Sequence, residues 1–237
     1  MKRILTLIVL GVICLTCNRT ETPVPKAKKV IISLSHLINN QILTSNKYYN
    51  LINKDSIRLV KLKYYIGNFV FHSPNAHLRP ATSNYYLIDG FINKEINIGE
   101  LPADNYHSVS YTIGIDSVTN AASNNTGDLD VTTNGDMYWA WTKEYKFLVN
   151  EGYSKNDTSQ KENAFVIHVA GNSNIVRDTL RNIVFQNADN YHLICKVDIG
   201  KLFLSPNKVN LNAPIDIQTE AKAKPISQNI KKMISLY

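Results

Sequence analysis

Apolar and polar residues alternate in short runs along most of the chain, and clusters of Asn, Asp, Ser and Gly separate the runs. A period of two is typical of half-buried β-strands, because successive side chains point to opposite faces of a sheet. The longest run covers residues 57–71, in which Gly67 predicts a bend or bulge. The other expected strands are residues 85–88, 95–98, 106–115, 137–149, 165–169, 183–185 and 191–199.

Helical periodicity is confined to two places. Near the C-terminus, Pro225 can open a helix in which Ile226, Ile230, Met233 and Ile234 share one face. A further helical turn is expected within residues 34–43. The rest of the pattern predicts a mainly β protein, an antiparallel β-sandwich or barrel-like single domain with a short C-terminal helix.

The N-terminus has the pattern of a targeting segment. Lys2 and Arg3 precede an apolar run, residues 4–13, that is too short to span a bilayer comfortably. Leu15-Thr16-Cys17 is a loose version of a bacterial lipobox, so we interpret residues 1–17 as a lipoprotein signal peptide and Cys17 as the lipidation site. The alternative is an ordinary secretory signal, in which Cys17 has no special role.

Either interpretation places the mature chain outside the cytosol, in the bacterial cell envelope. With lipidation, the protein is anchored to a membrane, at the periplasm or the outer membrane. Residues 18–29 are polar with two prolines and predict an extended tether, and residues 30–237 form the predicted β domain. Within that domain Cys195 is the one cysteine, so no intrachain disulfide is expected and a buried structural thiol is favoured.

Charge and motif content narrow the classes of function. The chain has 26 Lys and Arg against 19 Asp and Glu, a formal net charge of +7. The basic residues are scattered and form no stripe with exposed aromatics, so we expect no nucleic-acid partner. Gly-x-Ser-x-Gly, His-Glu-x-x-His, phosphate-binding glycine loops and Cys-x-x-Cys are all missing, and we therefore expect no enzyme activity.

Both tryptophans lie in the stretch Met137-Tyr138-Trp139-Ala140-Trp141. On a regular strand, Met137, Trp139 and Trp141 would point to one side and Tyr138 to the other. The result would be an aromatic, redox-sensitive surface beside the loop of residues 116–136. The same alternation is also typical of a sandwich core, so a purely structural role for the pair stays open.

Two histidines are expected on apolar faces. His168 interrupts the apolar run of residues 165–171, so it is desolvated and needs a partner. His107 alternates with Val109, Tyr111 and Ile113. Each can be a hydrogen-bonded core residue or a metal ligand, and imidazole beside soft or aromatic groups suits copper better than calcium or magnesium.

Eight short motifs, in order, resemble those of the MbnP-like copper-binding proteins of bacterial envelopes. They are LKYYIGNF (62–69), YYLID (85–89), IGIDS (113–117), GDLD (127–130), MYWAW (137–141), YKF (145–147), EG (151–152) and IHVAG (167–171). The resemblance implies a β-rich extracytoplasmic protein, copper as the bound metal, and a di-haem peroxidase partner that oxidises a tryptophan to kynurenine. Kynurenine and histidines hold copper(I) in related proteins.

Carried over by motif, the resemblance makes Trp139 and Trp141 unranked candidates for oxidation and His168 a candidate copper ligand. His107 joins the candidate ligands only through the strand pattern, and Met137, Asp116 and Tyr138 are candidate supporting residues. The leading hypothesis is a non-enzymatic, copper-binding lipoprotein that serves as a carrier, a store or a component of a sensor. The alternative is a surface module that recognises a glycan or a protein through its aromatic residues, without metal.

Overall fold

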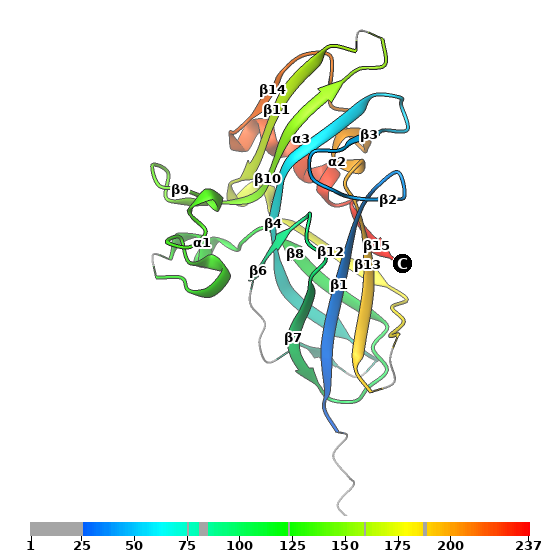
Figure 1. Cartoon of the computed structure of the whole chain (residues 1–237). Helices are drawn as coiled ribbons and strands as arrows, with labels where there is room; N and C mark the ends of the chain where they lie inside the picture. Colours follow the sequence, from blue (N-terminus) through cyan, green and yellow to red (C-terminus); the bar gives the residue numbers. More distant parts are fainter. Residues whose placement is uncertain (1–25, 75, 81–84, 123, 159, 187–188) are drawn as a thin grey trace, which may run out of the picture.

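One long strand, β4 (Ser56–His72), runs through the molecule and organises the larger of two sheets (Figure 1). The computed structural model describes residues 26–237 except 75, 81–84, 123, 159 and 187–188. The predicted signal peptide, Cys17 and residues 18–25 of the predicted tether lie outside the described residues. The first strand begins at Lys28, two residues before the predicted start of the domain at residue 30.

The larger sheet has ten strands in the order β12-β8-β4-β10-β11-β14, with β3, β5 and β6 also paired with β4, and β9 with β10. Its other strands are β3 (Tyr48–Asn50), β5 (His77–Leu78), β6 (Tyr85–Asp89), β8 (Ser108–Ile113), β9 (Tyr138–Trp139), β10 (Glu144–Lys155), β11 (Glu162–Ala170), β12 (Val176–Arg181) and β14 (Ile215–Ile217).

The smaller sheet has five strands in the order β15-β13-β1-β2, with β7 also paired with β1. They are β1 (Lys28–Ile38), β2 (Gln41–Ile42), β7 (Glu95–Leu101), β13 (Tyr191–Asp198) and β15 (Ile234–Leu236). The mainly β, sandwich-like fold is confirmed. The strand pairs are antiparallel except β1 with β13 and β11 with β14, which are parallel.

Helices are few and short. They are α1 (Ser117–Ala121), α2 (Lys201–Leu204), α3 (Glu220–Ile230) and the 3₁₀ turns η1 (Gly127–Leu129), η2 (Gly135–Met137) and η3 (Asn172–Asn174). The C-terminal helix is confirmed, but it begins at Glu220, because the Thr219 side chain accepts a hydrogen bond from the Lys222 N–H and caps it. Pro225 therefore lies inside the helix. The helix ends at Ile230, so the expectation that it includes Met233 and Ile234 is wrong, and Ile234 begins β15. In the part of the chain that the structure describes, no helix is long and apolar enough to cross a membrane.

The predicted helical turn at residues 34–43 is wrong, and the segment is a β-hairpin. β1 continues to Ile38, and Asn39 and Asn40 turn the chain into β2 with φ values of 50° and 60°. Two consecutive residues with positive φ form the hairpin turn that matches the twist of paired strands, and Asn tolerates that conformation well. The turn chemistry of Asn39-Asn40 therefore outweighs the helical spacing of the apolar residues.

Two of the predicted strands also need correction. Residues 183–185 do not form a strand. The strand in this part of the chain is β12, which pairs with β8 and whose sequence VRDTLR contains few apolar residues. The predicted strand 137–149 is interrupted after Trp139 by a turn in which Lys143 has a φ of 58°. Likewise, the predicted loop 116–136 contains α1, η1 and η2 rather than a continuous irregular segment.

Alternation along β4 and β10 separates two hydrophobic clusters. Leu62, Tyr64 and Leu148 belong to the main core, which lies between the sheets. Residues of the opposite parity, such as Tyr65 and Val149, belong to a smaller cluster on the other face, completed by Tyr85, Ile115, Leu129, Met137, Tyr145 and Phe147. Figure 1 shows the segment with α1 and β9 projecting from the sheet on that side. Cys195 lies in the main core, 1% exposed, and burial raises its pKa to about 12, which confirms the expected structural thiol.

Gly152 lies beside a register shift in the pairing of β4 with β10, and its replacement by alanine tests the packing there. A Cβ atom there would lie 2.1 Å from the carbonyl oxygen of Arg58 and 2.8 Å from the Phe165 ring. Because backbone must move to admit the methyl group, Gly152→Ala should lower the free energy of unfolding by about 2 kcal/mol in urea denaturation. Gly135→Ala is the control, since no atom lies within 4 Å of its Cβ position. Equal stabilities of the two variants would contradict the packing argument.

His36 makes folding stability depend on pH. The side chain is 2% exposed, its Nε2 shares a 2.9 Å hydrogen bond with the Tyr64 hydroxyl, and burial lowers its pKa from 6.5 to about 4, against the attraction of Asp89. The folded state therefore favours neutral imidazole, so the stabilisation is present above pH 6.5 and decreases as the pH falls towards 4. Between pH 7 and 4, the free energy of unfolding measured by urea denaturation should fall by about 3 kcal/mol more in the wild type than in His36→Gln. Parallel losses in the two proteins would show that His36 does not titrate in this way.

Candidate metal centre around Trp139 and His168

The centre is built on the face of β4, β10 and β11 that points away from the main core. Lys63, Val149 and His168 are aligned across the three strands, and residues paired in this way point to the same face. Glu151 lies two residues along from Val149 and so also points to this face. This arrangement brings charged and titratable side chains together beneath the segment that carries α1 and β9.

His168 is buried with one ring nitrogen paired and the other free. The Glu151 Oε1 atom lies 2.8 Å from Nε2 of His168, and His168 is 7% exposed. Nδ1 is also buried, and none of the residues that the structure describes forms a hydrogen bond with it. A carboxylate partner fixes the proton on Nε2, which leaves the lone pair of Nδ1 available.

Burial lowers the pKa of His168, and nearby Lys146 and Lys61 lower it further, while the hydrogen bond from Nε2 to Glu151 and the charge of that carboxylate raise it. The pKa remains below its usual value, so the imidazole is neutral at pH 7. Neutral imidazole is the form that binds metal ions. The prediction that His168 is desolvated and has a partner is confirmed, and Glu151 is that partner, which the sequence pattern did not identify.

Trp139 lies against His168, whereas Trp141 lies in water. The ring centroids of Trp139 and His168 are 6.0 Å apart, and those of the two indoles are also 6.0 Å apart. Trp139 is 6% exposed and Trp141 is 79% exposed. The expected common face is therefore wrong for Trp141, because β9 ends at Trp139 and the Lys143 N–H closes a turn on the Trp139 carbonyl.

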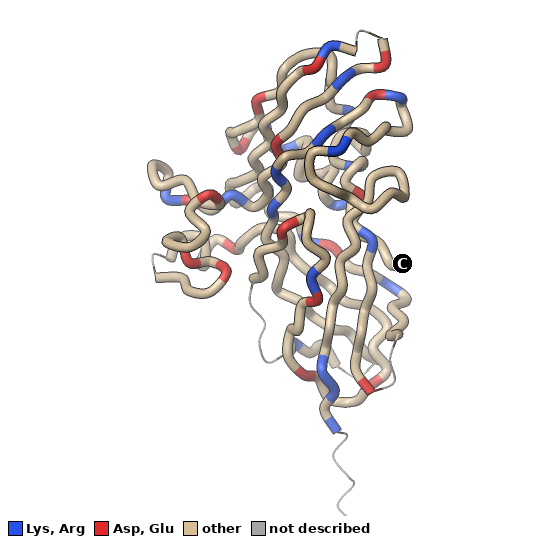
Figure 2. The backbone as a smooth tube through the Cα atoms, viewed as in Figure 1, with Lys and Arg blue, Asp and Glu red and all other residues tan. Residues whose placement is uncertain are grey.

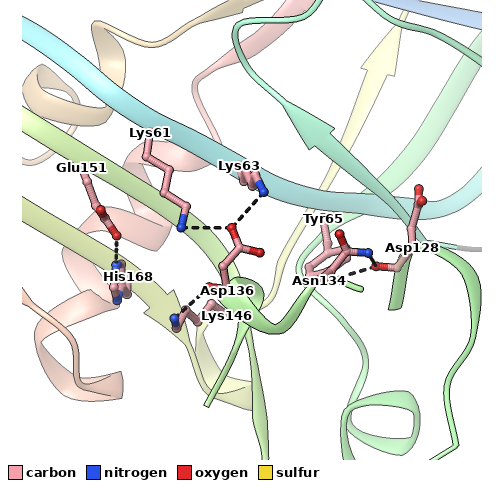
Figure 3. A network of polar contacts seen from close by, with 9 residues as sticks. All are labelled: Lys61, Lys63, Tyr65, Asp128, Asn134, Asp136, Lys146, Glu151 and His168. Atoms are coloured by element: carbon pink, nitrogen blue, oxygen red, sulfur yellow. Dashed lines mark hydrogen bonds and ion pairs between the residues drawn. The ribbon is translucent and has the colours of Figure 1, made fainter. Parts of the chain in front are cut away.

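A lysine and aspartate network surrounds the centre (Figure 3). The Asp136 carboxylate forms ion pairs with Lys61 at 3.0 Å and with Lys63 at 2.8 Å. Lys146 donates to the Asp136 carbonyl oxygen, and its ammonium lies 5.7 Å from the centroid of the Trp139 ring. Burial, followed by repulsion from Lys61, lowers the pKa of Lys146. The network ties η2 and β9 to the sheet and so holds Trp139 in place.

The candidate supporting residues have structural roles. Met137 is fully buried in the smaller hydrophobic cluster, and the Tyr138 ring packs edge-on against Tyr145 with centroids 5.0 Å apart. Asp116 caps α1: its carboxylate accepts hydrogen bonds from Tyr85, Val118 and Thr119. Burial alone would raise the pKa of Asp116, but these hydrogen bonds outweigh it and lower the pKa.

His107 lies far from His168 in the fold. It is exposed and precedes β8, whose first residue, Ser108, is paired with His72. Along β4, His72 is nine residues from Lys63, which is aligned with His168. At roughly 3.3 Å per residue, this length of β4 separates His107 from His168 by about 30 Å. The expected apolar position of His107 is therefore wrong, and the two histidines cannot share a metal ion.

The donor set at the centre is small. Over residues 26–237, apart from the few that the structure leaves undescribed, no group of three or more His, Cys, Asp or Glu side chains could hold a metal ion. His168 fits the role of a single imidazole ligand: its Nδ1 is unpaired, and Glu151 holds the other nitrogen as carboxylates do behind metal-bound histidines.

These features define a mainly β, sandwich-like protein with a tryptophan and histidine centre on the outer face of its larger sheet. The MbnP family model matches residues 27–225, and the chain belongs to the MbnP family. Among solved structures, MbnP from Methylosinus trichosporium is similar in fold, with a TM-score of 0.50 and 14% sequence identity over 86% of this chain and 87% of that chain. None of the curated proteins matches the sequence significantly.

Glu151→Gln should lower the pKa of His168 further, because the neutral amide no longer stabilises the imidazolium. The decrease is limited because Glu151 is partly exposed, and solvent screens its charge. An NMR titration of the His168 ring resonances measures this shift. Glu162→Gln, which removes a carboxylate paired with Arg58 elsewhere on β11, is the control and should leave the His168 pKa unchanged. A Glu151→Gln titration identical to the wild type would contradict the assigned contact.

Proposed function

We propose that the protein is a non-enzymatic, lipid-anchored copper-binding protein of the bacterial cell envelope, acting as a carrier, a store or a component of a sensor. In this proposal, copper(I) is held by Nδ1 of His168 and by a kynurenine formed from Trp139. The observation that carries it is a buried, neutral imidazole whose unpaired nitrogen lies in a centre beside a buried indole. Membership of a family linked to copper supports it.

The structure favours Trp139 over Trp141 as the oxidised residue. Trp139 is packed between the His168 ring, the Trp141 ring and the Lys146 ammonium. An aniline and a carbonyl formed from Trp139 would therefore arise beside the His168 ring. Trp141 extends from the turn after β9 into water, so an oxidising partner that docks on this hairpin would contact Trp141 directly.

The oxidation requires a partner that uses peroxide, for which a di-haem peroxidase is the candidate. The indole C2–C3 bond breaks, two peroxide molecules each supply one oxygen atom and accept two electrons, and two waters are released. Hydrolysis of the resulting formyl group releases formate and leaves kynurenine. The chain itself supplies no oxidant, and its contribution is to place one indole beside His168 and to present the other to the partner.

A second candidate is a surface module that recognises a glycan or a protein without metal. The exposed fraction of Trp141, 79%, favours it, because a large apolar ring in water is a common anchor for stacking partners. Such a module would depend on Trp141 and not on His168. The two candidates therefore differ in which single substitution removes binding.

The test is a copper(I) titration of the full-length protein, before and after treatment with peroxide and a di-haem peroxidase. We expect the treated wild type to gain about 4 Da at Trp139 and to bind one copper(I) stoichiometrically. His168→Ala should weaken binding at least a hundredfold, since removal of a metal ligand is more severe than the 10–100-fold typical of its second shell. Trp139→Phe should abolish both the mass change and the binding.

Trp141→Phe is the matched control for loss of an indole. It should retain copper binding once Trp139 has been oxidised, although oxidation itself should slow. A treated wild type that binds no copper would overturn the proposal. Modification confined to Trp141 would overturn the assignment of Trp139.

A further inference from the structure

The hairpin between β4 and β5 is closed by two histidines that face each other. His72 and His77 are paired across the strands, and their Nδ1 atoms lie 2.8 Å apart. The rings meet edge to face, with centroids 4.9 Å apart and an angle of 68° between the planes. Two imidazole nitrogens therefore converge on one point at the end of the larger sheet. Neither residue belongs to the centre around Trp139.

His72 is held in this orientation from behind. The Ser110 hydroxyl lies 2.7 Å from its Nε2, and that hydroxyl also forms a 2.9 Å hydrogen bond with Thr179 on β12. When the hydroxyl of Ser110 accepts the proton of Nε2, the Nδ1 of His72 is left with its lone pair. This is the arrangement in which an outer hydrogen bond fixes the tautomer and direction of a metal-binding histidine.

The separation of the two Nδ1 atoms suits a shared metal ion. Metal–nitrogen bonds of about 2.0–2.1 Å, with angles between 90° and 109°, place two donor nitrogens about 2.8–3.4 Å apart. The observed 2.8 Å lies at the short end of this range. A metal ion could enter by displacing the one proton between the rings, with small rotations of the exposed His77 side chain.

We propose that His72 and His77 form a second, surface metal site that takes a divalent transition metal ion, with Cu(II) bound more tightly than Zn(II). Imidazole nitrogens suit both ions, and for a given site of nitrogen and oxygen donors Cu(II) binds more strongly. No third His, Cys, Asp or Glu completes a cluster among the described residues, so water fills the remaining positions. The open positions make this a site for loosely held metal.

The charges around the hairpin are mixed. Burial lowers the pKa of His72, and His77, His107 and Arg181 lower it further. The positive charge of Arg181 opposes a bound cation. Asp104, whose carboxylate accepts a hydrogen bond from Ser73 next to His72, brings a negative charge to the same hairpin. We therefore expect an affinity typical of two imidazoles and no more.

This site does not depend on the function proposed for Trp139 and His168. The two sites lie about 30 Å apart along β4, which follows from the nine residues between Lys63 and His72 at roughly 3.3 Å each. The hairpin site requires no oxidation of the protein. It would bind Cu(II), whereas the other centre is proposed for copper(I).

The test is a Cu(II) chloride titration of the full-length, untreated protein, followed by electron paramagnetic resonance. We expect one saturable site with nitrogen couplings from two imidazoles. His77→Ala should weaken binding at least tenfold and reduce the signal to that of a single imidazole at most. His77→Gln, which keeps the exposed position polar, should do the same if the alanine variant folds poorly.

His192→Ala is the control. It removes a histidine from the five-stranded sheet, where His192 contacts Ser33 at 2.8 Å. This variant should bind Cu(II) as the wild type does. A wild type without saturable Cu(II) binding, or a His77→Ala variant with unchanged affinity, would overturn the proposal. If His168→Ala lost Cu(II) binding and His77→Ala kept it, the Cu(II) would be assigned to the centre around Trp139 and His168 instead.

Discussion

The two-faced character of β4, β10 and β11 is the constraint on which the rest of the structure depends. Each strand has one face in the main core, so every second residue must lie on the other face. That face carries Val149, Glu151 and His168 near the middle of the sheet, where they cannot all be left in water. The segment with α1, η2 and β9 covers them, and the smaller hydrophobic cluster fixes its position. The candidate centre therefore follows from the register of three strands and one covering segment.

The sequence predicted those parts of the fold that rest on alternation of apolar and polar residues. The long run at 57–71 became β4 because apolar residues recur at every second position between its register shifts, one of which lies between Gly67 and Val70, where a bend or bulge was expected. The strand at 191–199 was found because its alternation is regular. β12 was missed because edge strands are polar on both sides, and Val176 and Leu180 are its only large apolar residues. The hairpin at Asn39-Asn40 was missed because turn chemistry outweighed helical spacing.

At the candidate centre, local pattern identified individual residues but not their partners. His168 was expected to be buried because its neighbours are apolar, and it is. Its contact with Glu151 depends on the register of β10 against β11, which no local pattern contains. Trp141 was misplaced because alternation holds only within a strand, and β9 is two residues long. The distance between His107 and His168 likewise depends on how far apart two points on β4 lie.

Charge is distributed without a dominant sign. Figure 2 shows Lys and Arg interspersed with Asp and Glu along the molecule, and around the centre Asp136 and Glu151 lie among Lys61, Lys63 and Lys146. Such mixing keeps the local potential small, so binding there rests on donor atoms and shape rather than on a long-range field. Lys146 and Lys61 lower the pKa of His168 and so favour its neutral imidazole.

The unpaired Nδ1 of His168 has a cost in folding. A buried polar atom without a partner destabilises a protein by about 1–3 kcal/mol, and no described residue relieves it here. An apolar side chain of similar volume would avoid this cost. The fold is thus less stable at this point than its packing would allow. A sequence optimised for stability alone would be expected to replace this histidine.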